Sequence, residues 1–271
     1  MSQILYDLKN VVCSYDGIHP VLKVENLQIM GGQLVVMIGK SGVGKSTILE
    51  TLGLMNNTLV DGEITFIPEG NSQYKLSDLW NEETLLSDIR NSHMSFIFQN
   101  TNLMHNFTAY ENACIPLLLQ GVDIDIALQR VEKAMDQVGL KEIKKDNHVA
   151  ELSGGQRQRL AFVRAITPDF SVLFGDEPTG NLDENNSNEL MKVIQEALAE
   201  KNKTSIIVSH NIELSLAFAD QIIMMVKDNG YGEILEENIF RSTGKNGARK
   251  WIDYKENEVV GIKELLHKKL K

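Results

Sequence analysis

The sequence predicts an α/β fold, and three observations carry this prediction. Short apolar runs rich in β-forming residues alternate with longer helical stretches. Two of these runs, 172–174 and 205–208, are followed at once by polar residues, which is typical of parallel strands buried on both faces. Turn signals at Asp16-Gly17 and Gly31-Gly32 interrupt the N-terminal segment, which indicates hairpins that lead into a buried strand at 35–38.

The remaining elements follow from local patterns. A further strand is predicted at 63–67, after the turn signal Asp61-Gly62. Residues 103–165 are predicted to be mainly helical, because the apolar residues of 126–138 are spaced three and four apart and Gly139 is a suitable stop. After residue 236 the periodicity weakens, and the chain ends in a predicted short helix at 258–271. We therefore expect a main domain at 1–236, with a helical subdomain inserted at about 103–165, and an appendage of unknown role at 237–271.

The composition is that of an ordinary folded chain. Of 271 residues, 42% are hydrophobic and 24% are charged, close to the averages of globular proteins. The net charge of −10 argues against a broad surface for phosphate backbones, so we expect no nucleic-acid partner. Cys13 and Cys114 have neither CxxC spacing nor a nearby His pair, which favours free, structural thiols.

No membrane-spanning segment is predicted. Spanning a bilayer takes about 20 consecutive apolar residues, and no run in this sequence approaches that length. The first residues also lack a charged region followed by an apolar core and a cleavage site. We expect the chain to stay in the cytoplasm.

Residues 39–47 carry the first chemical motif. They fit the phosphate-loop pattern GxxxxGK[ST] and lie between a predicted strand and a predicted helix, where this motif must lie. Lys45 is expected to reach the β and γ phosphates of ATP, and the hydroxyl of Ser46 to coordinate Mg²⁺. The alternative is a glycine-rich turn that binds nothing. The residues expected to bind nucleotide here are Gly39, Lys40, Ser41, Gly42, Val43, Gly44, Lys45, Ser46 and Thr47.

A pair of acids follows the predicted strand at 172–174. Charges at the end of a buried strand are costly unless a cation or a reaction requires them. Asp176 is suited to hold Mg²⁺, and Glu177 is suited to orient and polarise an attacking water. The alternative is that the pair merely marks a strand ending at the surface.

A second anion-binding helix end is predicted at 152–156, which reads Leu-Ser-Gly-Gly-Gln. An amphipathic helix follows it at 157–166, so a serine hydroxyl and glycine amides cap a helix N-terminus. With these motifs in one chain, the sequence resembles the ABC ATPases. The resemblance implies a P-loop NTPase (RecA-like) core with an N-terminal antiparallel β subdomain and a helical signature subdomain.

The resemblance also implies how ATP is held. In the family, the LSGGQ segment contacts the γ phosphate bound to the phosphate loop of the other subunit. The chain is therefore expected to form a head-to-tail homodimer around two ATP molecules. The residues that would supply this contact are Ser153, Gly154, Gly155 and Gln156.

Four further positions match the family in order and spacing. Gln99 matches the Q-loop glutamine that touches Mg²⁺ and water, and His210 matches the switch histidine that contacts the γ phosphate. Asp183 lies in the D-loop match, and Tyr15 matches the aromatic residue that stacks on adenine. Taken singly, Tyr15 could pack a strand and His210 could lie at a surface strand end.

Three segments resemble the lipoprotein-release and macrolide-export branch: 89–99, 102–118 and 176–183. This implies an ATPase at the inner face of the cell membrane that drives a separate membrane permease with a large extracytoplasmic domain. An ATPase that transmits force without transport remains open, as does a wholly soluble ABC ATPase. The segment 102–110, with Leu103, Met104 and Phe107, is expected to form the groove for a cytoplasmic helix of the permease. The alternative is that these three residues pack the helical subdomain against the sheet.

Overall fold

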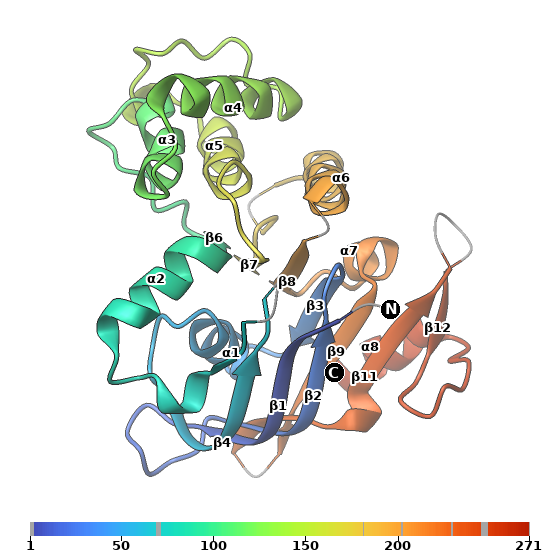
Figure 1. The fold of residues 1–271 in the computed structure, drawn as a ribbon. Helices are drawn as coiled ribbons and strands as arrows, with labels where there is room; N and C mark the ends of the chain where they lie inside the picture. Colours follow the sequence, from blue (N-terminus) through green and yellow to red (C-terminus); the bar gives the residue numbers. More distant parts are fainter. Residues whose placement is uncertain are drawn as a thin grey trace.

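The computed structural model describes residues 3–68, 72–180, 182–201, 203–228, 230–244 and 249–270. Its strands join one sheet in the order β5-β4-β1-β2-β10-β9-β3-β8-β7-β6, and β11 and β12 extend this sheet from β9 (Figure 1). The structure is of the predicted α/β class. The strands are β1 (Ile4–Cys13), β2 (Leu22–Met30), β3 (Leu34–Gly39), β4 (Leu59–Phe66), β5 (Tyr74–Lys75), β6 (Met94–Ile97), β7 (Val172–Asp176), β8 (Thr204–Ser209), β9 (Gln221–Asp228), β10 (Tyr231–Ile234), β11 (Ile239–Thr243) and β12 (Lys250–Ile252).

The longer helices cover both faces of this sheet and form a separate group beside it. They are α1 (Lys45–Leu52), α2 (Glu83–His93), α3 (Ala109–Leu119), α4 (Ile124–Gln137), α5 (Gly154–Ile166), α6 (Glu184–Lys201), α7 (Ile212–Phe218) and α8 (Ile262–Leu270). Within the described residues, none of the helices has the length and apolar content needed to cross a bilayer.

The centre of the sheet is parallel. β3 lies between β8 and β9, and β7 lies between β8 and β6. All six residues of β3 are buried, as are those of β8. Alternate residues of β3 enter different cores: Val36 packs with the helical side, whereas Val35 packs with α1 and the N-terminal strands. Because parallel strands end at one edge, the segments that follow β3, β7 and β8 meet there.

The N-terminal strands form an antiparallel layer, as predicted. β1 pairs with β2 and with β4. β10 pairs antiparallel with β9 and parallel with β2, and it therefore joins this layer to the parallel centre. The segment 72–88 contributes β5 and the start of α2, and residues 69–71 lie outside the described part.

The helical subdomain consists of α3, α4 and α5, which lie together at the top of Figure 1. The side chain of Asp123 accepts a hydrogen bond from the backbone of Asp125 and starts α4. Gly139, with a φ of +69°, follows the end of α4, so the predicted stop is confirmed. The residues between α4 and α5 are irregular apart from one short 3₁₀ turn, Val149–Glu151.

The described residues of the C-terminal tail, 237–244 and 249–270, pack on the main core. β11 pairs with β9, and α8 packs against α7 and β9. Trp251, Ile262 and Leu266 are buried in the same apolar cluster as the helical side of β3. Cys13 and Cys114 are both buried, with free thiols. The domain boundary at residue 236 stays a prediction.

Candidate active site

The phosphate loop connects β3 to α1. Gly44 occupies the N-cap of α1 with a φ of +91°, and a Cβ at this position would lie 3.2 Å from the Cβ of Leu22. The backbone angle therefore favours glycine, and the close approach to Leu22 leaves little room for a side chain. The Nζ atom of Lys45 donates hydrogen bonds to the carbonyl oxygens of Gly39 at 2.8 Å and Lys40 at 2.9 Å. The lysine thus folds over the loop that the sequence predicts it to serve.

Lys45 is a buried cation, with only 7% of its surface exposed. Burial lowers the pKa of Lys45, and the nearby carboxylates of Glu177 and Asp176 oppose this shift. Its present hydrogen-bond partners are neutral carbonyls, which compensate a buried positive charge only in part. A phosphate on the loop would supply the missing anionic partner.

Asp176 is the last residue of β7 and faces the start of α1. The hydroxyl of Ser46 donates to Oδ2 of Asp176 at 3.3 Å. Burial raises the pKa of Asp176, while the hydrogen bond from Ser46 and the charge of Lys45 lower it. Among the described residues no cluster of three or more His, Cys, Asp or Glu could hold a metal ion. A hydroxyl and one carboxylate nevertheless fit Mg²⁺, which usually takes one or two protein carboxylates and completes its shell with phosphates and water.

Glu177 has a strained backbone. Its φ is +47°, a left-handed conformation that costs a non-glycine residue about 1–3 kcal/mol. The N–H of Glu177 donates to the carbonyl of Val208 at 3.0 Å, which secures this conformation to β8. Strain of this kind is retained where the surrounding structure needs a side chain aimed in one direction.

The side chain of Glu177 points toward His210. Nε2 of His210, which directly follows β8, is in direct contact with Oε1 of Glu177. His210 is 55% exposed and Glu177 is 16% exposed. Both residues line an open cavity of about 470 Å³, together with Ser209, Asn211 and Glu213. The structure therefore brings Lys45, Ser46, Asp176, Glu177 and His210 to one edge of the sheet.

Two other predicted residues, Gln99 and Tyr15, lie around this edge. Gln99 is exposed and follows β6, whose Ile97 pairs with Gly175 of β7. This register places Gln99 beyond the same strand ends as Asp176. The hydroxyl of Tyr15 lies 3.1 Å from Oγ1 of Thr47, and the ring is 59% exposed beside α1. An exposed aromatic ring next to the phosphate loop is suited to stacking on a base.

Asp183 has a structural partner of its own. Its Oδ1 accepts a hydrogen bond from the backbone N–H of Asn186 at 2.9 Å, at the start of α6. This bond lowers the pKa of Asp183. The structure therefore shows Asp183 as a helix-capping residue, and its predicted contact with nucleotide stays a prediction.

The signature segment, Ser153–Gln156, lies at the start of α5. Oγ of Ser153 accepts from the N–H of Gln156 at 3.3 Å, and Oε1 of Gln156 accepts from the N–H of Ser153 at 2.8 Å. This reciprocal capping box fixes the helix end. Ser153 is exposed, and a Cβ built on Gly154 or Gly155 would meet nothing within 4 Å. The helix end therefore presents an open, electropositive surface.

Two supporting residues were not predicted. The buried side chain of Gln158 donates to the carbonyl of Pro178 at 2.8 Å and so connects α5 to the segment that follows Glu177. A polar residue on the buried side of an amphipathic helix was the available signal. Gly232 of β10 lies beneath the phosphate loop, where a Cβ would come within 1.8 Å of the carbonyl of Val43. An isolated glycine in a strand can mark such a close backbone approach.

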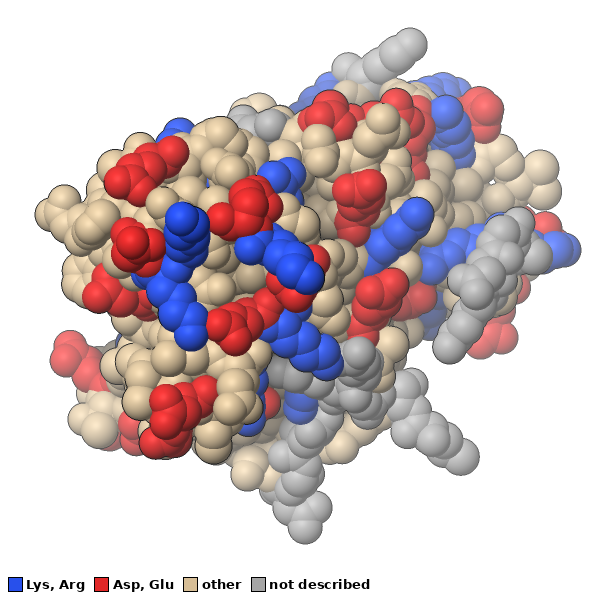
Figure 2. Space-filling model, turned by 90° about the horizontal axis from the view of Figure 1, so that it is seen from above, with Lys and Arg blue, Asp and Glu red and all other residues tan. Residues whose placement is uncertain are grey.

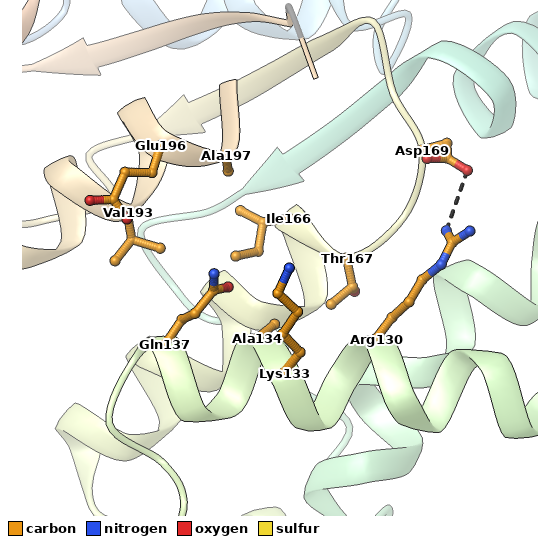
Figure 3. Close-up of a pocket in the computed structure, with 10 residues that line it drawn as sticks. All are labelled: Arg130, Lys133, Ala134, Gln137, Ile166, Thr167, Asp169, Val193, Glu196 and Ala197. Atoms are coloured by element: carbon orange, nitrogen blue, oxygen red, sulfur yellow. Dashed lines mark hydrogen bonds and ion pairs between the residues drawn. The ribbon is translucent and has the colours of Figure 1, made fainter. Parts of the chain in front are cut away.

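Another cleft, of about 270 Å³, lies between α4 and α6 (Figure 3). Arg130 and Asp169 form an ion pair of 3.4 Å at one end of it, and Lys133 and Glu196 add one further charge of each sign. The predicted nucleotide-binding residues lie elsewhere. In the described residues visible in Figure 2, acidic and basic side chains are interspersed over the face seen from above. That face does not resemble the continuous basic surface of nucleic-acid-binding proteins.

Comparisons with known proteins identify the family and the fold. A family described as "ABC transporter" matches residues 22–180. The lipoprotein-releasing system ATP-binding protein LolD of Rickettsia bellii is 36% identical over 218 residues, which cover 79% of this chain and 92% of the relative. The macrolide export ATP-binding/permease protein MacB of Pasteurella multocida is 35% identical over 241 residues. This match covers 88% of the chain but only 35% of MacB, so the chain spans about a third of that relative.

Two solved structures are similar along most of the chain. The dimeric structure of MJ0796, a bacterial ABC transporter cassette, has a TM-score of 0.71 at 31% identity and covers 81% of this chain and 94% of that one. A dimeric post-hydrolysis state of MJ0796 bound to ADP and Pi has a TM-score of 0.73 at 29% identity. It covers 89% of this chain and 100% of that one.

Proposed function

Because the chain belongs to the ABC transporter family as an ATP-hydrolysing subunit, we propose that it drives a separate membrane permease of the lipoprotein-release or macrolide-export type. One observation carries the chemistry: Lys45, Ser46, Asp176, Glu177 and His210 converge at one edge of the parallel sheet. In this proposal, residues 1–236 form the ATPase domain, and residues 237–271 are a C-terminal appendage to it.

The phosphate loop binds the β and γ phosphates of ATP. Lys45 exchanges the carbonyls of Gly39 and Lys40 for phosphate oxygens, and this exchange gives its buried charge an anionic partner. Ser46 and Asp176, with Gln99 beyond the adjacent strand, would hold Mg²⁺. The ion would neutralise charge on the phosphate oxygens.

Glu177 acts on the water. Its carboxylate accepts a proton from the water while the water oxygen attacks the γ phosphorus, and the bond to the β–γ bridging oxygen breaks to give ADP and phosphate. The contact with His210 and the backbone bond to Val208 fix the direction of this carboxylate. His210, in contact with Glu177, would reach the γ phosphate beside it.

The site is completed by a second copy of the chain. The exposed end of α5, with Ser153, Gly155 and their neighbours, is suited to cover a γ phosphate but is bonded only to itself and to Glu142 among the described residues. The solved MJ0796 cassettes of the same fold are dimeric. We therefore place each ATP between the loop 39–47 of one copy and the segment Ser153–Gln156 of the other.

The permease contacts the segment 102–110. Arg164 donates to the carbonyls of Thr101 and Asn102, and the buried Asn112 bonds both backbone groups of Met104. These bonds fix the backbone while the side chains of Met104 and Phe107 stay 37% and 41% exposed. Leu103, which the sequence places in the same groove, is 6% exposed and belongs to the core. The docking surface therefore consists of Met104 and Phe107, at the inner face of the membrane.

A hydrolysis assay tests the catalytic assignment. Glu177→Gln preserves the shape and hydrogen bonding of the side chain but removes the proton acceptor. We expect ATP binding to be retained and turnover to fall by about 10²–10⁴-fold, the usual contribution of a general base. Turnover of the purified variant near that of the parent would remove Glu177 from its role.

A further inference from the structure

We propose that the C-terminal tail positions the switch residue His210, and that Lys263 of α8 is the positioning residue that transmits this effect through Glu213. The inference rests on the proposed function of His210. It assigns a role to a segment that the ATPase chemistry does not use.

The first observation is the location of α7. This helix begins at Ile212, two residues after His210, and Asn211 caps it by accepting a hydrogen bond from the N–H of Leu214 at 2.9 Å. The connection between β8 and α7 is therefore only two residues long. A shift of α7 must move His210, because so short a connection cannot absorb the displacement. Glu213, in the first turn of α7, lines the same cavity as His210 and Glu177.

The second observation is the contact between α8 and the first turn of α7. Nζ of Lys263 lies 2.9 Å from Oε1 of Glu213, and Nε2 of His267 lies 3.7 Å from the same oxygen. Ile262 and Leu266, four positions apart on α8, are buried in the core cluster that contains residues of α7. The apolar pair thus docks α8, and Lys263 holds the one carboxylate of α7 that faces the catalytic cavity.

The third observation is at the opposite end of α7. Arg249 of the tail donates a hydrogen bond to the carbonyl of Ala219, which directly follows α7. The N–H of Ser242 donates to the carbonyl of Asp220 at 2.8 Å. Two separate parts of the tail therefore hold α7 at its first turn and at its C-terminal end. This arrangement fixes the axis of α7, and with it the position of His210 opposite Glu177.

Charge reversal in the purified full-length chain tests the proposal. Lys263→Glu places two carboxylates opposite one another, and we expect kcat for ATP hydrolysis to fall by about two- to fivefold, which is the size that one exposed ion pair supports. KM for ATP should be unchanged, because the nucleotide is held by the phosphate loop. Lys263→Arg should match the parent.

The matched control is Lys250→Glu. It reverses another exposed lysine of the tail, whose 3.0 Å ion pair with Glu258 involves no residue of α7. We expect this variant to hydrolyse ATP like the parent. The double variant Glu213→Lys/Lys263→Glu restores the pair with exchanged charges and should regain most of the lost kcat.

Failure of this proposal and failure of the proposed function give different results. The proposal is overturned if Lys263→Glu has the kcat of Lys250→Glu, or if the exchanged pair is no better than the single variant. Thermal melting checks folding, and if Lys263→Glu melts early, Glu213→Gln breaks the same pair without a like charge and decides the question. A parent chain that does not hydrolyse ATP, or an active Glu177→Gln, would instead count against the proposed function.

Discussion

The phosphate-loop edge and the signature helix end are both suited to binding anions, yet they differ in how many partners each has within one chain. At the loop, Lys45, Ser46, Asp176 and Glu177 are held by partners within the chain, and Lys45 is almost fully buried. At the start of α5, Ser153 is exposed and caps only its own helix. One region is assembled in a single copy, whereas the other presents its amides to open space.

This difference suggests a two-part site, in which the phosphate-loop edge is one part and the signature helix end is the other. The loop edge depends on parallel strands, which bring distant segments together because their ends share one side of the sheet. The helix end is fixed by its local capping box, which joins only residues close together in the sequence. The two regions can then meet across two copies, with Gln158 as one connection between them inside each copy.

The largest effect, on ATP binding, is expected at the phosphate-loop edge. Lys45→Ala removes a charged donor, and each such hydrogen bond is worth about 1.5–3 kcal/mol. We expect ATP affinity to fall by about a hundredfold or more and turnover to be lost. Titration with a fluorescent ATP analogue measures this. Lys75→Ala, which removes an exposed lysine paired with Glu63, is the control and should bind normally.

A smaller effect, on hydrolysis and not on ATP binding, is expected at the signature helix end. Ser153→Ala should reduce hydrolysis about tenfold while ATP still binds the isolated chain, because the loop is untouched. Losing the cap also costs α5 about 1 kcal/mol. Thr108→Ala removes the matched capping box of α3 and provides the control for that cost. If both variants hydrolyse ATP equally well, Ser153 is only a cap and the two-part site is wrong.

The smallest effect on catalysis is expected at Met104. Burying a new carboxylate against a docked helix costs about 1–3 kcal/mol or more, so Met104→Glu should release the permease. ATP hydrolysis by the isolated chain should be unchanged. Co-purification with the detergent-solubilised permease measures the association, and Val260→Glu, an equally polar change at an exposed tail residue, is the control. Retained association in Met104→Glu would place the docking surface elsewhere.

The parts of the fold that could be predicted from sequence are those with strong local signals. The apolar runs at 172–174 and 205–208 gave β7 and β8, and Gly139 gave the end of α4. The motif residues could be placed because each follows a strand or starts a helix. Their convergence at one edge then follows from parallel pairing.

The remainder depends on non-local contacts. β12 has three residues, too few for a periodic pattern, and β11 joins β9 across the fold. The contact of Gln158 with Pro178 and the approach of Gly232 to Val43 likewise join segments that are distant in the sequence. Exposure of Met104 beside burial of Leu103 could not be predicted, because the segment has no regular secondary structure to set a side-chain period.

The two-part site is tested most directly by the mass of Glu177→Gln with and without ATP. Without turnover, the closed state should accumulate. Size-exclusion chromatography with light scattering should then show one chain of 30.4 kDa without nucleotide, and twice that mass with Mg-ATP and one ATP bound per chain. Adding Ser153→Ala should weaken the dimer. A Glu177→Gln chain that binds ATP fully and remains a monomer would contradict the division of the site between two copies.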